Sequence, residues 1–301
     1  MMKPIGIYSA VISFAFIFFT QSEANAQRHM RERGNPAQAE AVAPAEENYP
    51  QISGLVSVDQ LDPELRCGIG RELSCDIAVA KQYGLIETGL IPQFPEGFEC
   101  REIDEAYAIS YTAKRDREQY HGGIDMPAPW GTPMIAAADG VVVANFEGKR
   151  SFRGREIILR HRPEDTGFPF YIYTQYAHFD AQPEFKVGDT IHMGQVLGPT
   201  GNSGIGRNGA QSQRRRPAIH FATWFSPVEE FAVTRGKVIP RQSLWMDPNA
   251  LFLPKDHALE SKTLQALPND RKHVPVAIML EDGTVVPKGS KVVWPYHCWK
   301  K

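Results

Sequence analysis

The chain has 301 residues, of which 33 are lysine or arginine and 35 are aspartate or glutamate, so its formal net charge is −2. A chain so close to neutral has no global basic field, and we expect no nucleic-acid partner. Its length suffices for one ordinary domain with appended segments.

The N-terminus has the pattern of an export signal. Lys3 precedes an apolar run over residues 5–19, and a small-x-small cleavage pattern ends at Ala26. These features predict a secretory signal peptide over residues 1–26. The apolar run is shorter than the roughly 20 residues of a membrane span. We therefore expect a periplasmic or secreted protein with no stable membrane span after cleavage; a retained N-terminal anchor is the alternative.

Two segments separate the signal from the rest of the chain. Residues 27–50 are rich in Ala, Glu, Pro and Arg, and such a composition offers little apolar surface to bury, which predicts a flexible linker. Residues 51–103 are predicted to form a small cap with short helices. One helix is expected to start at Ser57 and a second to end at Gly84. Because the cap directly precedes the next domain, we hypothesise that it covers and inhibits the groove of that domain.

The chain has four cysteines, Cys67, Cys75, Cys100 and Cys298. An even number behind an export signal suits disulfide bonds. Three pairings are open, of which Cys67 with Cys75 closes the shortest loop and leaves Cys100 with Cys298. A cysteine-ligated zinc site is the alternative, although the chain contains no Cys-x-x-Cys.

Residues 104–252 have the pattern of an antiparallel β-sheet domain. Short runs rich in valine, isoleucine and tyrosine, such as residues 141–143, are separated by glycine turns, and no helices alternate with them. Residues 253–301 are a C-terminal extension. In it the dipeptide Asp282-Gly283 stands between two apolar runs, which predicts a β-hairpin.

Two histidines and an aspartate in the β-rich region indicate a metal site. His121 and Asp125 stand four positions apart in the sequence His-Gly-Gly-Ile-Asp, and His220 follows much later. Two imidazoles and one carboxylate are a ligand set that zinc uses when its fourth position stays open for water. His178 lies between them in a strand-like setting. If the four side chains converge, the site is that of a zinc hydrolase with a histidine beside the metal.

Further segments accompany these four residues in a fixed order. They are His121–Asp125, Pro129–Pro133, Ala138–Val142, Tyr176–His178, Val187–Asp189, Gly194–Gly198, Thr200–Gly204 and Ile219–Phe221. This order and spacing resembles the lysostaphin/LytM-type zinc endopeptidases, which cut peptide bonds in peptidoglycan. The resemblance implies a mainly β fold with an antiparallel sheet groove over residues 104–252. It does not cover the cap or the extension.

The resemblance implies that His121, Asp125 and His220 ligate one Zn2+ ion and that His178 is a catalytic histidine. The family's second catalytic histidine stands two residues before the last ligand, where this chain has Ala218. Zinc lowers the pKa of its bound water, and a neighbouring histidine can move a proton or stabilise an oxyanion. We therefore predict an exported zinc-dependent endopeptidase that cleaves the peptide cross-links of peptidoglycan, with the zinc-bound water as nucleophile and His178 assisting.

Ala218 leaves alternatives open. In the first, the domain is catalytically weak or silent and regulates other cell-wall hydrolases as its partners. In the second, the protein is an exported protease with no cell-wall substrate. Arg216, in the inserted run Gln211–Pro217, is a candidate replacement that would stabilise the oxyanion or hold substrate carboxylates. A solvated loop is the simpler interpretation of that run.

Overall fold

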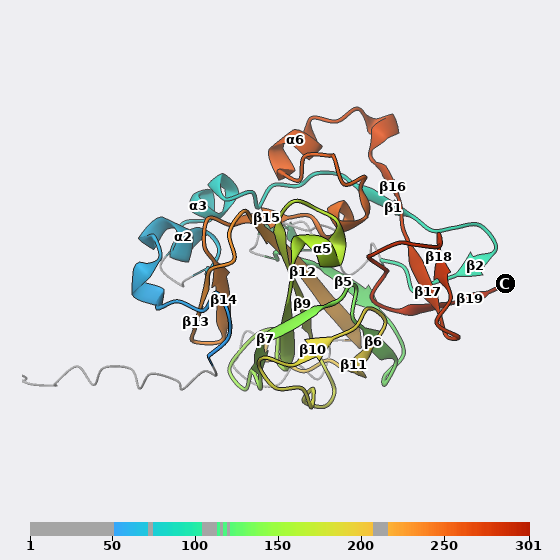
Figure 1. Ribbon diagram of the computed structural model, residues 1–301, viewed down its shortest axis with the longest axis horizontal. Coiled ribbons are helices and arrows are strands. Elements are labelled where there is room, and N and C mark those ends of the chain that lie inside the picture. Colours follow the sequence, from blue (N-terminus) through green and yellow to red (C-terminus); the bar gives the residue numbers. More distant parts are fainter. Residues whose placement is uncertain (1–50, 72–74, 104–112, 115–116, 119–120, 207–215) are drawn as a thin grey trace, which may run out of the picture. The chain divides into compact units, whose positions relative to one another are not determined.

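The computed structural model describes most of the chain beyond the predicted signal peptide and linker, which both lie outside the described residues (Figure 1). The described residues are 51–71, 75–103, 113–114, 117–118, 121–206 and 216–301. All of them belong to one compact unit, Tyr49–Lys301. Within these ranges no helix is both long enough and apolar enough to cross a membrane.

A seven-stranded sheet holds the core of this unit, with six strands in the order β10-β7-β8-β9-β12-β15 and β5 paired to the first half of β12. Every neighbouring pair in this sheet is antiparallel. The prediction of a mainly β fold is therefore confirmed. The strands are β5 (Ile124–Pro127), β7 (Gly140–Phe146), β8 (Glu156–His161), β9 (Tyr171–Ala177), β10 (Thr190–Ile191), β12 (Ala218–Ser226) and β15 (Leu244–Met246).

The register of the central strands places four residues in one row across the sheet. His220 on β12 lies opposite Asp125 on β5 and opposite Ala177 on β9, and Ala177 lies opposite Glu156 on β8. Residues that face each other across an antiparallel sheet point to the same side. The side chains of Asp125, His220 and Glu156 therefore share one face, and all three are buried.

Apolar and aromatic side chains fill the other face of the sheet. Tyr176 and Phe221 are fully buried register partners on β9 and β12, with ring centroids 5.2 Å apart. Ile157 on β8 is the register partner of Tyr176 and is also fully buried, and β-branched side chains of this kind are favoured in a pleated sheet. This apolar layer packs behind the strands that carry the row of polar residues.

The helical cap lies at one side of the sheet, beside the hairpin of β13 and β14 (Figure 1). Helices α2 and α3 each begin at an aspartate, Asp62 and Asp76, whose side chain accepts a backbone N–H two residues later. The Cys67–Cys75 disulfide links α2 to the residue directly before the N-cap of α3. The small helical cap is as predicted, although α2 was not anticipated. The elements here are η1 (Val58–Gln60), α2 (Pro63–Gly68), α3 (Ile77–Gln82), β13 (Phe231–Thr234) and β14 (Lys237–Pro240).

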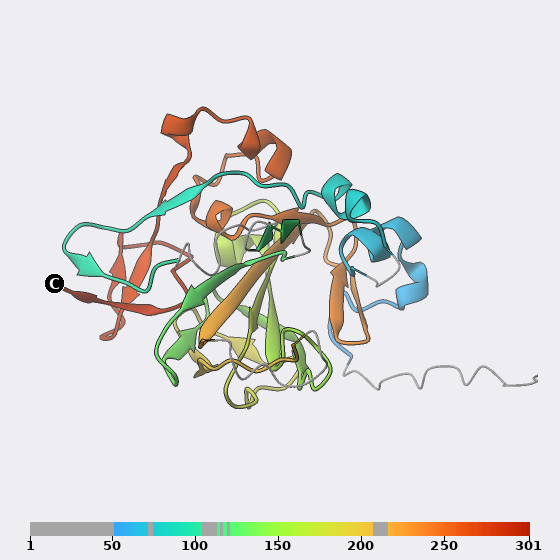
Figure 2. The ribbon, with the colours of Figure 1, turned by 180° about the vertical axis from the view of Figure 1, so that it is seen from behind.

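The C-terminal extension forms sheets with the end of the cap segment, on the other side of the central sheet (Figure 2). Strand β16 pairs in parallel with β1, and β19 pairs antiparallel with β2, next to the Cys100–Cys298 disulfide. The predicted hairpin around Asp282-Gly283 is present as β17 and β18. The strands are β1 (Ile91–Gln93), β2 (Phe98–Glu99), β16 (His273–Pro275), β17 (Ile278–Leu280), β18 (Val285–Val286) and β19 (His297–Lys300).

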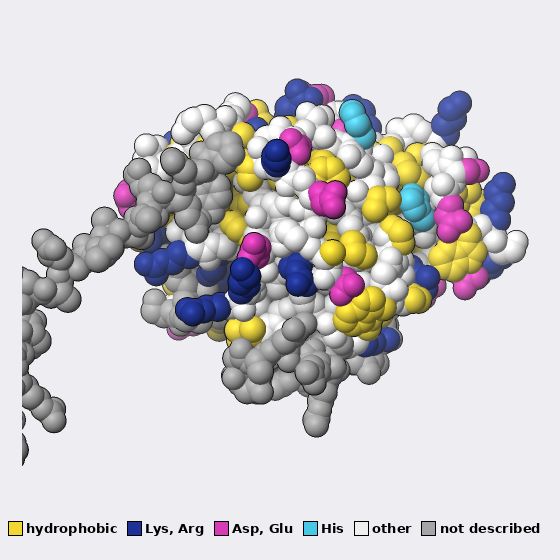
Figure 3. Space-filling view, turned by 90° about the horizontal axis from the view of Figure 1, so that it is seen from below, with side chains coloured by type: hydrophobic (Ala, Val, Ile, Leu, Met, Phe, Trp, Pro, Cys, Tyr) yellow, Lys and Arg dark blue, Asp and Glu magenta, His cyan; other side chains and the backbone are white. Residues whose placement is uncertain are grey.

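Short elements complete the described chain, and β6 and β11 pair in a separate two-stranded antiparallel sheet. They are β3 (Ala113–Lys114), β4 (Arg117–Glu118), β6 (Pro133–Ile135), α5 (Pro163–Thr166), β11 (Val196–Pro199), η2 (Pro248–Phe252), α6 (Ser261–Gln265) and η3 (Asn269–Arg271). On the face shown in Figure 3, lysine and arginine side chains are interspersed with aspartate and glutamate side chains, and apolar side chains lie between them.

Candidate metal centre

Three side chains of the kinds that bind zinc converge where β5 and β12 meet. Oδ1 of Asp125 lies 3.1 Å from Nε2 of His121 and 2.9 Å from Nδ1 of His220. One ligand atom from each of these three buried residues lies within 4.8 Å of the other two. The structure thus brings together the three residues that the sequence predicts as metal ligands.

The donor set and its spacing fit a zinc ion. Zinc takes imidazole nitrogen and carboxylate oxygen at about 2.0–2.2 Å, and the edge of a tetrahedron with such bonds is about 3.3–3.6 Å long. The two observed separations, 2.9 and 3.1 Å, are a few tenths of an ångström shorter than that edge, so a small outward movement of the side chains would fit the ion. Three protein donors leave one position of a tetrahedron for water or substrate, which is typical of a catalytic site.

The two glycines that follow His121 are required by close contacts. Gly122 has a φ of +66°, and a Cβ atom there would lie 2.7 Å from the indole ring of Trp245. A Cβ atom on Gly123 would lie 2.8 Å from the imidazole of His220. The glycines therefore let the chain pass directly against the ligand on the neighbouring strand.

Asp125 is held as a carboxylate. Burial by itself raises its pKa, but the adjacent imidazoles of His121 and His220 outweigh burial and hold the pKa of Asp125 well below its usual value. The side chain is thus in the charged form that a divalent cation requires.

His178 lies beside this cluster, directly after β9. Its ring centroid is 5.8 Å from that of His220, and its backbone has a φ of +74°. Nδ1 lies 2.8 Å from the carbonyl oxygen of Ser203. Because a carbonyl only accepts, Nδ1 carries the proton and Nε2 is the basic nitrogen. The histidine is therefore oriented for proton transfer through Nε2.

Ala218 lies on β12, two residues before His220, and shares its face of the sheet. It is buried, and its N–H donates to the carbonyl of Gly201 at 3.1 Å. Arg216 is half-buried just ahead of the strand, and Arg214 and Arg215 lie outside the described residues. The replacement of a catalytic histidine by Arg216 stays a prediction.

A buried carboxylate without a sequence-predicted role lies in the same row of the sheet. Glu156 is 1% exposed, accepts a hydrogen bond from Gln175 and lies 3.4 Å from Nε of Arg153. Burial raises the pKa of Glu156, and the charge of Arg153 opposes this only in part. The register of the sheet places the Glu156 carboxyl group two strands from His220, on the same face.

Two residues outside the β-rich domain contact the segments that carry the ligands. Arg71 of the cap donates from Nη1 to the carbonyl oxygen of His121 at 3.0 Å. The hydroxyl of Tyr296 in the extension donates to the carbonyl oxygen of Met126 and accepts the N–H of Ile219. Neither residue belongs to a motif, so the sequence carries no signal for these contacts.

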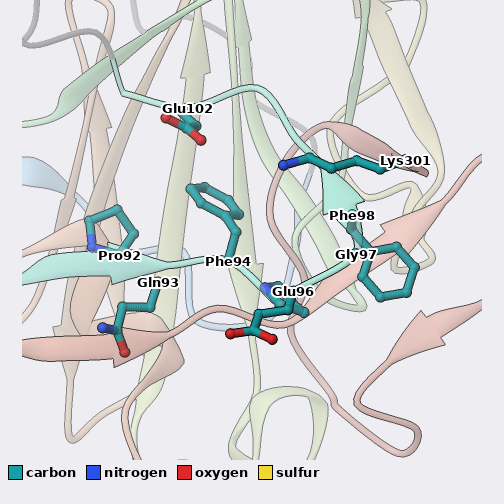
Figure 4. Close-up of a pocket in the computed structure, with 9 residues that line it drawn as sticks. Pro92, Gln93, Phe94, Glu96, Gly97, Phe98, Glu102 and Lys301 are labelled. Carbon is teal, nitrogen blue, oxygen red and sulfur yellow. The ribbon is translucent and has the colours of Figure 1, made fainter.

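A surface cavity of about 610 Å³ lies elsewhere, between residues 92–102 and Lys301 (Figure 4). The ring of Phe94 projects into it and packs edge-on against Trp294, with ring centroids 5.1 Å apart. Its lining contains none of the predicted metal or catalytic residues. The cluster of His121, Asp125 and His220 therefore stays the candidate site, and this cavity is separate from it.

Part of the chain is similar to a known peptidase family. Residues 119–239 match the sequence model described as Peptidase family M23. The DD-carboxypeptidase/endopeptidase Mpg of Neisseria meningitidis is 27% identical over 164 residues, which are 54% of this chain and 32% of Mpg. The peptidoglycan DD-endopeptidase ShyC of Vibrio cholerae is 37% identical over 84 residues, 28% of this chain and 17% of ShyC. The chain thus spans a third or less of the length of these relatives.

Among solved structures, the catalytic domain of lysostaphin from Staphylococcus simulans is similar to this chain at 23% identity. The match covers 39% of this chain and 77% of the lysostaphin domain, with a TM-score of 0.30. LytU is 24% identical, and the match covers 45% of this chain and 81% of LytU, with a TM-score of 0.32.

Proposed function

We propose that this protein is a zinc-dependent endopeptidase that cleaves the peptide cross-links of peptidoglycan, because residues 119–239 match the sequence model of peptidase family M23. The observation that carries the proposal is the convergence of His121, Asp125 and His220 on one point, with His178 beside them. The activities for which Mpg and ShyC are named support the substrate class. We also propose that the protein is exported, which the two disulfides support.

The residues of the chain have distinct roles in this proposal. Zinc, when bound, supplies a Lewis acid that polarises the scissile carbonyl and lowers the pKa of a water molecule. Two histidines and a charged Asp125 hold the ion, as their spacing supports. His178 keeps its Nδ1 proton on the carbonyl of Ser203, so Nε2 can take a proton from the nucleophile or return one to the leaving amine.

We propose the following division of the chain: a signal peptide over 1–26, a linker over 27–50, a cap over 51–103, the peptidase domain over 104–252 and an extension over 253–301. The pairing of β1 with β16 and of β2 with β19 supports a joint structural role for the end of the cap and the extension.

One observation favours a second candidate function. The buried residue two positions before His220 is Ala218, which offers no proton donor or acceptor in its side chain. In this alternative the domain is catalytically weak or silent and regulates other cell-wall hydrolases. The complete ligand set argues against this alternative, because a purely regulatory domain has no need of a metal with an open position.

The deciding experiment is digestion of purified cross-linked peptidoglycan by the zinc-loaded protein, with cross-linked fragments measured by chromatography. His121→Ala removes one ligand, whereas His192→Ala removes an exposed imidazole that does not belong to the cluster. We expect loss of cross-links with the native protein and with His192→Ala, and no loss with His121→Ala. Intact cross-links in every sample favour the regulatory function. Digestion of unfolded casein but not of peptidoglycan favours a general protease.

A further inference from the structure

The hydroxyl of Tyr296 lies where three segments of the metal centre meet. Tyr296 belongs to the C-terminal extension, just ahead of β19 and outside the residues that match the peptidase family. The side chain is fully buried, and burial raises the pKa of Tyr296, so the phenol stays neutral and keeps its proton. The Tyr296 hydroxyl, which comes from outside the residues that match the peptidase family, therefore contacts the candidate metal centre as a neutral group.

Two contacts of this hydroxyl connect the strands that carry the ligands. The hydroxyl donates to the carbonyl oxygen of Met126 and accepts the N–H of Ile219, each at 3.2 Å. Met126 directly follows Asp125 on β5, and Ile219 directly precedes His220 on β12. Met126 and Ile219 are register partners, so the phenol bridges the two strands at the pair next to the ligand pair.

The third contact leads to His178. Oγ1 of Thr200 lies 3.0 Å from the phenol oxygen, and because the phenol proton goes to Met126, Thr200 is the donor. The loop that starts at Thr200 holds His178 at two points. Its Gly201 donates a backbone N–H to the carbonyl of His178 at 3.1 Å, and its Ser203 accepts the Nδ1 proton.

The extension fixes the position of Tyr296 independently of the ligand strands. The carbonyl of Pro295 accepts the N–H of Ile135 at 3.0 Å, and the N–H of Val293 donates to the carbonyl of Ala137 at 2.8 Å. Cys298, two residues after Tyr296, is bonded to Cys100. The phenol is therefore a fixed point against which β5 and β12 are placed.

We propose that Tyr296 is a positioning residue of the metal centre, whose hydroxyl sets the spacing between Asp125 and His220 and the placement of His178. Metal ligands need positions within about 0.2 Å of the required distances, so a small separation of two strands weakens binding. Without the hydroxyl, the N–H of Ile219 and the carbonyl of Met126 each lose one buried contact, and the pairing of β5 with β12 alone sets the spacing of the strands next to the ligand pair. The inference rests on the proposed function for its metal, but its test does not depend on hydrolysis.

The test compares Zn2+ affinity by competition with a chromophoric chelator in the native protein, Tyr296→Phe and Tyr173→Phe. Tyr173 is a matched control because it is equally buried and its hydroxyl donates to the carbonyl of Glu229, away from both ligand strands. We expect Tyr296→Phe to bind Zn2+ about ten-fold more weakly, as is usual when the support of a ligand is removed. Native affinity in Tyr296→Phe, or an equal loss in both variants, overturns the inference.

A second variant serves if Tyr296→Phe does not fold. Replacing Cys100 and Cys298 together by serine releases the anchored end of the extension and keeps the phenol, so a weaker Zn2+ affinity is again expected. Native affinity in that variant overturns the inference.

Cleavage of peptidoglycan by the native protein is measured in parallel. Zn2+ binding that depends on Tyr296 without any cleavage overturns the proposed function alone, whereas cleavage with binding independent of Tyr296 overturns the inference alone.

Discussion

Arg71 in the cap donates a hydrogen bond from Nη1 to the backbone carbonyl of His121, at 3.0 Å. Its guanidinium carbon also lies 5.0 Å from the ring centroid of Trp245. Gly122 leaves room for both contacts, because a Cβ atom there would clash with Trp245 and with the Arg71 guanidinium. The cap therefore helps to hold a candidate ligand in place, and inhibition of the groove by the cap stays a separate prediction.

Replacing Arg71 by methionine should destabilise the fold. The change removes a hydrogen bond from a charged donor and a cation–π contact, which together are worth about 2–4 kcal/mol at a partly buried site. We expect a fall of about this size, or somewhat less, in the free energy of unfolding measured with urea. Arg271→Met is the control, since Arg271 is exposed in η3. Equal losses in the two variants would show that the contact with His121 contributes nothing specific.

Adding a methyl group at Gly123 should disturb the metal centre directly. Its Cβ atom would lie 2.8 Å from the imidazole of His220 and 2.7 Å from the carbonyl of Phe221. We expect Gly123→Ala to bind Zn2+ at least about ten-fold more weakly. Gly283→Ala, in an open turn with no atom within 4 Å, should keep native affinity although its positive φ costs stability. Native Zn2+ affinity in Gly123→Ala would contradict the close packing of this loop against His220.

Asp247 gives the fold a pH dependence away from the metal centre. Burial raises its pKa to about 6, against 3.8 for the free side chain, although Thr88 and the N–H of Asn249 donate to it. Between these values the folded state binds more protons than the unfolded state, so this group's contribution to stability falls as pH rises from about 4 to 6.

Asp247→Asn should remove this pH dependence. Relative to the native protein, the free energy of unfolding of the variant should rise between about pH 4 and pH 7, by at most about 3 kcal/mol. Urea denaturation at a series of pH values measures it. Asp270→Asn is the exposed control and should follow the native curve. A constant difference between Asp247→Asn and the native protein would show that folding does not raise the pKa of Asp247.

The convergence of the three candidate metal ligands was predictable from sequence because residue type, spacing and strand context agree. His121 and Asp125 flank the glycines that the backbone needs, and His220 lies in an apolar run that forms a fully buried strand. The mainly β fold followed from the same apolar runs and glycine turns. The disulfide pairing did not follow, since chain position alone leaves three options, of which the structure has Cys67–Cys75 and Cys100–Cys298.

The supporting contacts were not predictable, because they join distant residues through single backbone groups. Arg71 is 50 positions from His121, and Tyr296 is 170 positions from Met126. A side chain that donates to a carbonyl places no demand on the type of residue that carries the carbonyl, so no pattern forms in the sequence. Helix α2 is different, because Asp62 followed by Pro63 is a recognisable helix start.

Introducing a histidine at Ala218 should raise the rate of cross-link cleavage. The side chain would lie on the face that carries His220, where a second imidazole can transfer a proton or stabilise an oxyanion. We expect a gain in kcat of about a hundred-fold with unchanged Zn2+ affinity, because the ligands are untouched. The added volume at a buried site costs about 1–3 kcal/mol of stability, so melting is measured alongside.

Ala218→Gln is the matched control, because it adds similar volume but no group that titrates near neutral pH. A gain with histidine but not glutamine identifies the missing imidazole as the limit on catalysis. Equal rates in a folded Ala218→His variant and the native protein would show that position 218 does not limit the reaction, and if both rates are zero, the regulatory function is favoured.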